Sequence, residues 1–149
     1  MNLVLSIILL FSFSEPIDMV KTRSLYFAAA ETEEGLDSFK EYLVSLPKNN
    51  VLVMGYKAMA TMIEAEFNWS PYKKYAFFNV GKDQLENAIA MQPTNAELIY
   101  LRYGVQTHAP FFLNYSSQIK SDRLLLLNAV KAMSDEDLKT RINDYLLKY

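Results

Sequence analysis

Residues 81–104, GKDQLENAIAMQPTNAELIYLRYG, carry the spacing that decides the fold. Gly81, Leu85, Ala88 and Pro93 follow one another at intervals of four, three and five residues. The first two intervals place a small, a bulky and a second small residue on one helix face, where the small ones let a neighbouring helix approach closely. The proline then ends the helix. The stretch therefore predicts a helix that packs tightly against a partner and stops before another helix begins.

The residues after Pro93 read as the opening of a second unit of the same kind. The order of small residue, bulky residue, alanine and proline is typical of the second helix of a tetratricopeptide repeat. In the next unit, Ile99 stands where a tryptophan is common. Tyr103 stands where glycine or alanine is usual, so we expect that helix pair to be packed differently. The predicted fold is all-α, with antiparallel helix pairs stacked in a tetratricopeptide-like array of about seven helices.

Apolar residues recur at steps of three and four through most of the chain, and no stretch alternates with a period of two for long enough to predict a strand. Ser70 before Pro71, and Asn95, are expected to cap helix starts. Ser134 with Asp137 resembles a capping box at the start of the last helix. Six of the expected helices cover residues 36–46, 49–67, 72–91, 95–106, 116–133 and 134–149.

The first fourteen residues, MNLVLSIILLFSFS, are predicted to be a cleaved signal peptide. Residues 3–11 are almost purely apolar, which suits the central region of a secretory signal and falls short of the ~20 residues that span a bilayer. Small residues precede Glu15, where we expect cleavage. The alternative is a buried first helix. If the signal peptide is cleaved, residues 15–149 form the mature protein, which we expect to be a single domain with no transmembrane segment, in the periplasm or secreted.

Composition excludes several classes of function. The net charge is -2 and no basic run is longer than Lys73-Lys74, so nothing favours nucleic acid as a partner. The absence of cysteine excludes disulfides, thiolate chemistry, zinc knuckles and iron–sulfur sites. No glycine-rich phosphate loop is present, so no cofactor is expected.

His108 is the single histidine of the chain. As a general base it would need a nucleophile, an orienting carboxylate and oxyanion donors, and the neighbouring sequence supplies no recognisable set. A metal site would need further ligands, and no second histidine, cysteine or local carboxylate pair offers them. We therefore expect no catalytic residue and no metal site, and interpret His108 as an exposed or capping residue between two helices.

Two stretches rich in aromatic residues remain as candidate binding surfaces: NWSPYKKYAFF, residues 68–78, and THAPFFLNY, residues 107–115. Each has two interpretations. The simpler one buries Trp69 and folds Phe111 and Phe112 over the helix ends to plug the core. The other leaves them exposed as anchors for a partner, because aromatic residues dominate interface cores. The candidate binding residues are Trp69, Tyr72, Lys74, Tyr75, Arg102, Gln106, His108, Phe111, Phe112 and Tyr115.

Arg102 is expected to be mainly structural. It occupies a repeat position that faces the partner helix, so the sequence predicts an ion pair with Glu64, Glu66 or Glu97. Glu64 and Glu66 are two residues apart on one helix and point in different directions, so they cannot act as a catalytic pair.

The phrases RSLYFAAAETEEGLDSF and KSDRLLLL, with NWSPYKK, LRYGVQ and APFFLNY between them, resemble an uncharacterised family of small exported helical proteins of Bacteroidetes-type bacteria. The resemblance covers most of residues 23–130. It implies a tetratricopeptide-like fold and export, and it implies no activity. The family mostly has a shorter polar residue where this chain has His108, which argues against a shared role for the imidazole.

The leading functional hypothesis is a non-enzymatic module that binds a protein or peptide of the cell envelope. The alternative is a binder of a small apolar or aromatic ligand, in a pocket lined by Met54, Met59, Met62 and the aromatic residues of 69–78. A cavity of roughly 300 Å³ or more between helices would favour the alternative. An enzyme with a tyrosine, lysine or carboxylate centre is the third hypothesis, and a cleft with perturbed ionisable groups would favour it.

Overall fold

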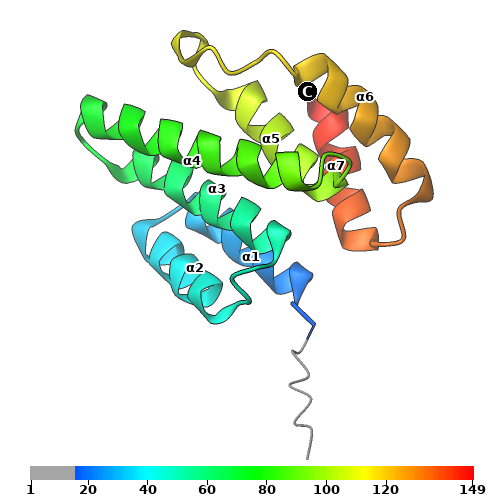
Figure 1. Ribbon diagram of the computed structural model, residues 1–149, viewed down its shortest axis with the longest axis horizontal. Coiled ribbons are helices and arrows are strands. Elements are labelled where there is room, and N and C mark those ends of the chain that lie inside the picture. Colours follow the sequence, from blue (N-terminus) through cyan, green and yellow to red (C-terminus); the bar gives the residue numbers. More distant parts are fainter. Residues whose placement is uncertain (1–15) are drawn as a thin grey trace, which may run out of the picture.

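The computed structural model describes residues 16–149, which fold into seven α-helices and two short 3₁₀ helices without a strand (Figure 1). The predicted signal peptide, residues 1–14, lies outside the described residues. The helices are α1 (Met19–Ala29), α2 (Glu33–Ser45), α3 (Val51–Phe67), α4 (Pro71–Met91), α5 (Ala96–His108), η1 (Phe111–Leu113), α6 (Ile119–Ala129), η2 (Val130–Ala132) and α7 (Glu136–Lys148).

Within residues 16–149, no helix has both the length and the hydropathy that crossing a membrane requires.

Side-chain caps set most of the helix starts. The predicted caps are confirmed: Ser70 accepts a hydrogen bond from the Lys73 amide with Pro71 in the first turn, and Asn95 caps α5. The prediction for α7 was wrong by one residue. Asp135, not Ser134, caps this helix, and its carboxylate accepts from the Leu138 amide at 3.0 Å. The remaining side-chain caps are Asp18 for α1, Thr32 for α2 and Asn50 for α3.

The helices pair as antiparallel neighbours, α1 with α2, α3 with α4 and α5 with α6, and the pairs stack along the chain (Figure 1). Between pairs, α1 contacts α3 and α3 contacts α5, so the first helices of successive pairs form one layer. The second helices cover them, with α2 against α3 and α4 against α5. This arrangement confirms the predicted all-α array of helix pairs.

The spacing in residues 81–104 has the predicted effect. A Cβ atom on Gly81 would lie 2.5 Å from Met62 Cγ and 2.7 Å from the Ala58 carbonyl oxygen, so only glycine lets α4 lie this close to α3. Leu85 and Ala88, on the same face of α4, are completely buried. Helices α3 and α4 therefore pack closely along the face of α4 that the spacing of Gly81, Leu85 and Ala88 predicts.

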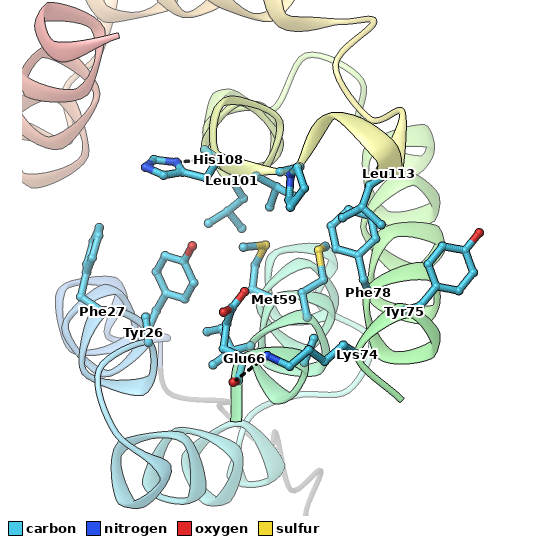
Figure 2. Close-up of a pocket in the computed structure, with 18 of the residues that line it drawn as sticks. Tyr26, Phe27, Met59, Glu66, Lys74, Tyr75, Phe78, Leu101, His108 and Leu113 are labelled. Atoms are coloured by element: carbon cyan, nitrogen blue, oxygen red, sulfur yellow. Dashed lines mark hydrogen bonds between the residues drawn. The ribbon is translucent and has the colours of Figure 1, made fainter. Parts of the chain in front are cut away.

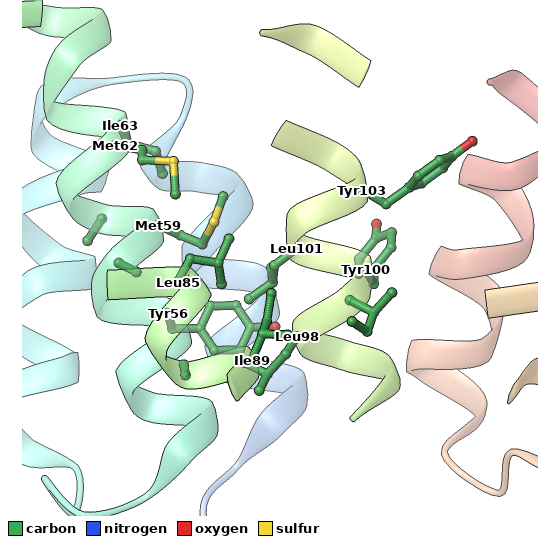
Figure 3. Packing of buried hydrophobic residues seen from close by; sticks show 14 of the residues in the cluster. Tyr56, Met59, Met62, Ile63, Leu85, Ile89, Leu98, Tyr100, Leu101 and Tyr103 are labelled. Carbon is green, nitrogen blue, oxygen red and sulfur yellow. The ribbon is translucent and has the colours of Figure 1, made fainter. Parts of the chain in front are cut away.

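Tyr103 is accommodated by α7. Its side chain is buried and its ring centroid lies 5.7 Å from that of Tyr145 in an edge-to-face arrangement. Tyr100, one turn earlier in α5, meets the same ring at 5.7 Å. The last helix thus packs on α5 through tyrosines, where small residues would be usual. The buried hydrophobic residues form one cluster that includes Phe39 of α2 and Ile142 of α7. Figure 3 shows its central part, where Tyr56 and Leu85 pack near Leu98 and Leu101.

A buried arginine joins four helices at one end of this layer. Arg23 of α1 is 2% exposed and its guanidinium binds Glu97 of α5 at 2.7 and 2.9 Å. It also binds Asp135 and Asp137 at the start of α7. Tyr56 of α3 donates its hydroxyl to the same Glu97 carboxylate at 2.6 Å. The Arg23–Glu97 pair and the groups bonded to it therefore link α1, α3, α5 and α7.

Candidate functional site

The layer formed by α1, α3, α5 and the end of α7 borders a cavity of about 710 Å³ (Figure 2). The start of α4 and the segment 109–113 form its remaining walls. We call this cavity the groove. Its volume falls within the ~300–1,000 Å³ that ligand pockets usually have.

The floor of the groove is apolar. Met59, Met62 and Ile63 of α3 lie opposite Leu101 and Val105 of α5, and the side chains come from helices that the core already fixes. Figure 2 shows Met59 and Leu101 facing each other across the cavity and Phe78 with Leu113 closing one side. A ligand in this part of the groove would be held by burial of apolar surface.

Two tyrosine hydroxyls without partners line the groove. Tyr100 is 7% exposed and Tyr26 is partly buried, and neither hydroxyl forms a hydrogen bond within residues 16–149. Burial raises the pKa of Tyr100 to about 12 and that of Tyr26 further, with the nearby Tyr145 contributing to both shifts. Both phenols therefore stay protonated at neutral pH and can act as hydrogen-bond donors.

His108 sits in a cluster of hydroxyl groups at the rim. Its Nδ1 lies 2.9 Å from the Tyr145 hydroxyl and 3.0 Å from the Gly104 carbonyl, and its Nε2 lies 2.9 Å from the Tyr149 hydroxyl. Thr107 forms a further hydrogen bond with Tyr145. No carboxylate is bonded to the imidazole among the described residues. His108 therefore fastens the end of α7 to the end of α5.

Lys74 and Glu66 are the charged residues that line the groove. The Lys74 ammonium donates to the Glu66 backbone carbonyl at 3.4 Å, which joins the start of α4 to the end of α3 (Figure 2). Within residues 16–149, no group of three or more histidine, aspartate or glutamate side chains is placed to hold a metal ion.

The candidate binding residues fall into three places. Lys74, Tyr75, His108 and Phe112 line the groove. Trp69, Tyr72 and Phe111 lie outside its lining on the surface, with Trp69 90% and Phe111 96% exposed. The interpretation that buried Trp69, Phe111 and Phe112 in the core was wrong. These residues occupy the turns at the ends of helix pairs, where no other element covers them.

Arg102, Gln106 and Tyr115 form a separate buried network between α4, α5 and α6. Arg102 binds both carboxylate oxygens of Asp122, at 2.8 and 2.6 Å, and Glu86 at 2.9 Å. The other members are Gln106, which donates to Asp122, and Tyr115, which donates to Glu86. The predicted partners Glu64, Glu66 and Glu97 were therefore wrong. Arg102 faces α4 and α6, whereas Glu97 is held by Arg23.

The predicted pocket is present in part. Met59, Met62, Tyr75 and Phe78 line the groove, whereas Met54 and Trp69 do not. Sequence reasoning missed the residues that α1, α5 and α7 supply, because it placed the pocket within one helix pair. The helical periodicity of residues 101–108 carried the signal, since Leu101, Gly104, Val105 and His108 recur at steps of three and four residues or adjoin on one face of α5. The missed groove residues are Tyr26, Phe27, Tyr100 and Tyr145.

No family model, curated protein or solved structure matches this chain.

Proposed function

We propose that this protein binds a small apolar ligand in the groove and performs no chemistry on it. The observation that carries the proposal is a cavity of about 710 Å³ with an apolar floor and a few polar groups at its ends. Sites for small molecules commonly combine these features. The hydroxyl groups around His108 support binding and not catalysis, because they offer neither an orienting carboxylate nor an oxyanion hole.

Gly104 offers a direct test, because it borders the groove and has room for a side chain. A Cβ atom there would meet only the Tyr145 hydroxyl, at 3.9 Å. Gly104→Leu fills part of the cavity, and Gly104→Ala is its matched control. We expect the purified protein to bind Nile red saturably, and Gly104→Leu to weaken this binding by at least about tenfold while Gly104→Ala retains it. Equal binding by the two variants would contradict the proposal.

A second candidate is the binding of a protein or peptide of the cell envelope. It is favoured by the aromatic side chains exposed beside the groove, above all Trp69 and Phe111. Exposed aromatic residues are common anchors in protein interfaces. Cross-linking in the native host, followed by mass spectrometry, tests it. A partner that is lost from both Trp69→Ala and Phe111→Ala supports this function, and retention that does not depend on these residues argues against it.

We also propose that the protein is exported, to the periplasm or beyond, on the basis of the apolar run in residues 3–11. Mass spectrometry of the protein from its native host is the test. A mature chain that starts at Glu15 supports export by a cleaved signal peptide, and an intact chain that retains residues 1–14 contradicts it.

A further inference from the structure

Tyr100 lines the groove, and its hydroxyl has no hydrogen-bond partner among residues 16–149. Its side chain is 7% exposed. Tyr56 donates to Glu97 and Tyr115 to Glu86, whereas Tyr103 also has an unbonded hydroxyl but lies outside the groove lining. Every fully buried side-chain nitrogen or oxygen among the described residues has a hydrogen-bond partner, so the unbonded Tyr100 hydroxyl is open to the groove and can donate to a ligand there.

Tyr26 supplies a second donor at the same end of the groove. Ring contacts with Tyr56 at 5.7 Å and Phe39 at 6.1 Å hold its side chain in place. Figure 2 shows its hydroxyl directed into the cavity, on the side of His108. Tyr100 packs on Tyr145, whose ring also contacts His108, so Tyr100 too lies toward the His108 end of the groove. Both phenols can therefore donate to a ligand there.

The surroundings of these hydroxyls favour an acceptor group on the ligand. Glu66 of α3 also lines the groove, and only its backbone carbonyl is bonded to Lys74 of α4. Arg141 lies on the α1 side, with its guanidinium 5.0 Å from the centre of the Phe27 ring. Arg141 is itself ion-paired with Asp137 at 3.0 Å, so its charge is compensated within the protein. The two phenol donors therefore suit an acceptor oxygen, whether charged or neutral.

The rest of the groove is lined by apolar side chains and suits a hydrocarbon chain. From Tyr26 and Tyr100 the lining continues as methionine, leucine, valine and phenylalanine side chains to Phe78 and Leu113. A polar head alone would leave most of the 710 Å³ empty, so the ligand must carry apolar bulk as well. We infer that the groove binds an acyl chain, with a carboxyl or ester oxygen held by the hydroxyls of Tyr26 and Tyr100. This inference rests on the proposed function and names its ligand class.

Displacement of Nile red by three matched compounds tests the inference: dodecanoic acid, methyl dodecanoate and dodecane. The variants are Tyr26→Phe, Tyr100→Phe and the double variant, each of which keeps the ring and removes one hydroxyl. Tyr72→Phe is the control, because Tyr72 is 82% exposed and lies outside the groove lining. Thermal unfolding of each variant establishes that the fold is unchanged.

We expect each single variant to weaken binding of the acid or the ester by about fivefold, and the double variant by roughly twentyfold or more. Binding of dodecane should be the same in all variants. A preference for the acid identifies a charged head, and equal affinity for acid and ester identifies a neutral carbonyl; both outcomes support the inference when they depend on the two hydroxyls.

Two results overturn the inference. One is an acid and an ester that bind the double variant as tightly as the wild type. The other is displacement by none of the three compounds. If Gly104→Leu still weakens Nile red binding in either case, the proposed function stands and the ligand class is wrong. If Gly104→Leu binds Nile red as tightly as Gly104→Ala, the proposed function is wrong as well.

Discussion

Arg23 and Glu97 stand 74 positions apart in the chain and form a two-pronged ion pair that is buried on both sides. The Arg23 Nε and Nη2 atoms meet the two carboxylate oxygens at 2.7 and 2.9 Å. Because Asp135 and Asp137 bind the same guanidinium, the pair joins α1 and α5 to the start of α7. The walls of the groove are therefore held at a fixed spacing by a charge that lies outside the groove lining.

Removing this guanidinium should destabilise the fold strongly. In Arg23→Gln, Glu97 keeps its buried negative charge without a cation, which costs about 3–5 kcal/mol in comparable cases. Urea denaturation gives the free energy of unfolding. Lys73→Gln removes a cation from an exposed site and is expected to change that energy by less than ~0.5 kcal/mol. A loss below ~1 kcal/mol in Arg23→Gln would show that the network does not hold the helices together.

Two tyrosines should respond differently to loss of the hydroxyl. Tyr56→Phe removes a 2.6 Å hydrogen bond to the buried Glu97 carboxylate, so we expect a loss of about 1.5–3 kcal/mol. Tyr100→Phe removes a hydroxyl that has no partner in the protein, so the free energy of unfolding should stay within ~0.5 kcal/mol of the wild type. Chemical denaturation of both variants without ligand is the measurement. Equal losses would contradict the assignment of Tyr100 as an unpaired donor.

Acid should weaken the contacts at the start of α7. The hydrogen bond with Arg23 lowers the pKa of Asp135, and the hydrogen bond with Arg141 lowers that of Asp137. A lowered folded-state pKa stabilises the fold above the unfolded value of about 3.9, and this contribution disappears as pH falls through the folded value. We compare the wild type with Asp135→Asn/Asp137→Asn, in which asparagine can still cap α7. The stability difference should be constant from pH 7 to about 5 and shrink below about 4. A difference that persists at pH 2 would rule out this charge effect.

Replacing Gly81, which contacts α3, and Gly104, which lines the groove, by alanine should change the free energy of unfolding in opposite directions. In Gly81→Ala the new methyl group would overlap Met62 and the Ala58 carbonyl, so we expect a loss of about 1–3 kcal/mol. Gly104→Ala adds a methyl group into open space within a helix and should gain roughly 0.5–1 kcal/mol. Thermal and urea unfolding measure both. A destabilised Gly104→Ala would mean that the space beside Gly104 is filled.

The exposed aromatic side chains should contribute little to stability. Trp69 and Phe111 are 90% and 96% exposed, so Trp69→Ser and Phe111→Ser are each expected to change the free energy of unfolding by less than ~0.5 kcal/mol. Phe39→Ser, at a completely buried position, is the contrasting variant and should lose several kcal/mol. A large loss of unfolding free energy in Trp69→Ser or Phe111→Ser would indicate that these side chains are buried.

Local features of this fold could be predicted from the sequence because their causes lie within a few residues. Ser70, Pro71 and Asn95 set helix starts through hydrogen bonds to the next turn, and these predictions are confirmed. The start of α7 was displaced by one position because Ser134 and Asp135 can both cap a helix, and Asp135 is also drawn to Arg23. Asp135 and not Ser134 caps α7, and the partner that distinguishes Asp135 is Arg23, which is distant in sequence.

Long-range partners could not be predicted, for reasons visible at Arg102 and Trp69. Several carboxylates lay within plausible reach of Arg102, and only the packing of α6 against α5 selects Asp122. Trp69 is a large apolar residue and so favours burial, yet the turn between α3 and α4 offers nothing to cover it. The groove was missed in part because its walls come from helices that the chain visits at its beginning, middle and end.

The separation of Arg23 from its carboxylates also has a consequence for the order in which the chain acquires its properties. During synthesis, α1 leaves the ribosome long before Glu97, and Asp135 follows later still. Until then the guanidinium lacks two of its three carboxylate partners, and the wall that Tyr145 supplies does not exist. The groove is therefore completed only when α7 docks, after the rest of its lining has been synthesised.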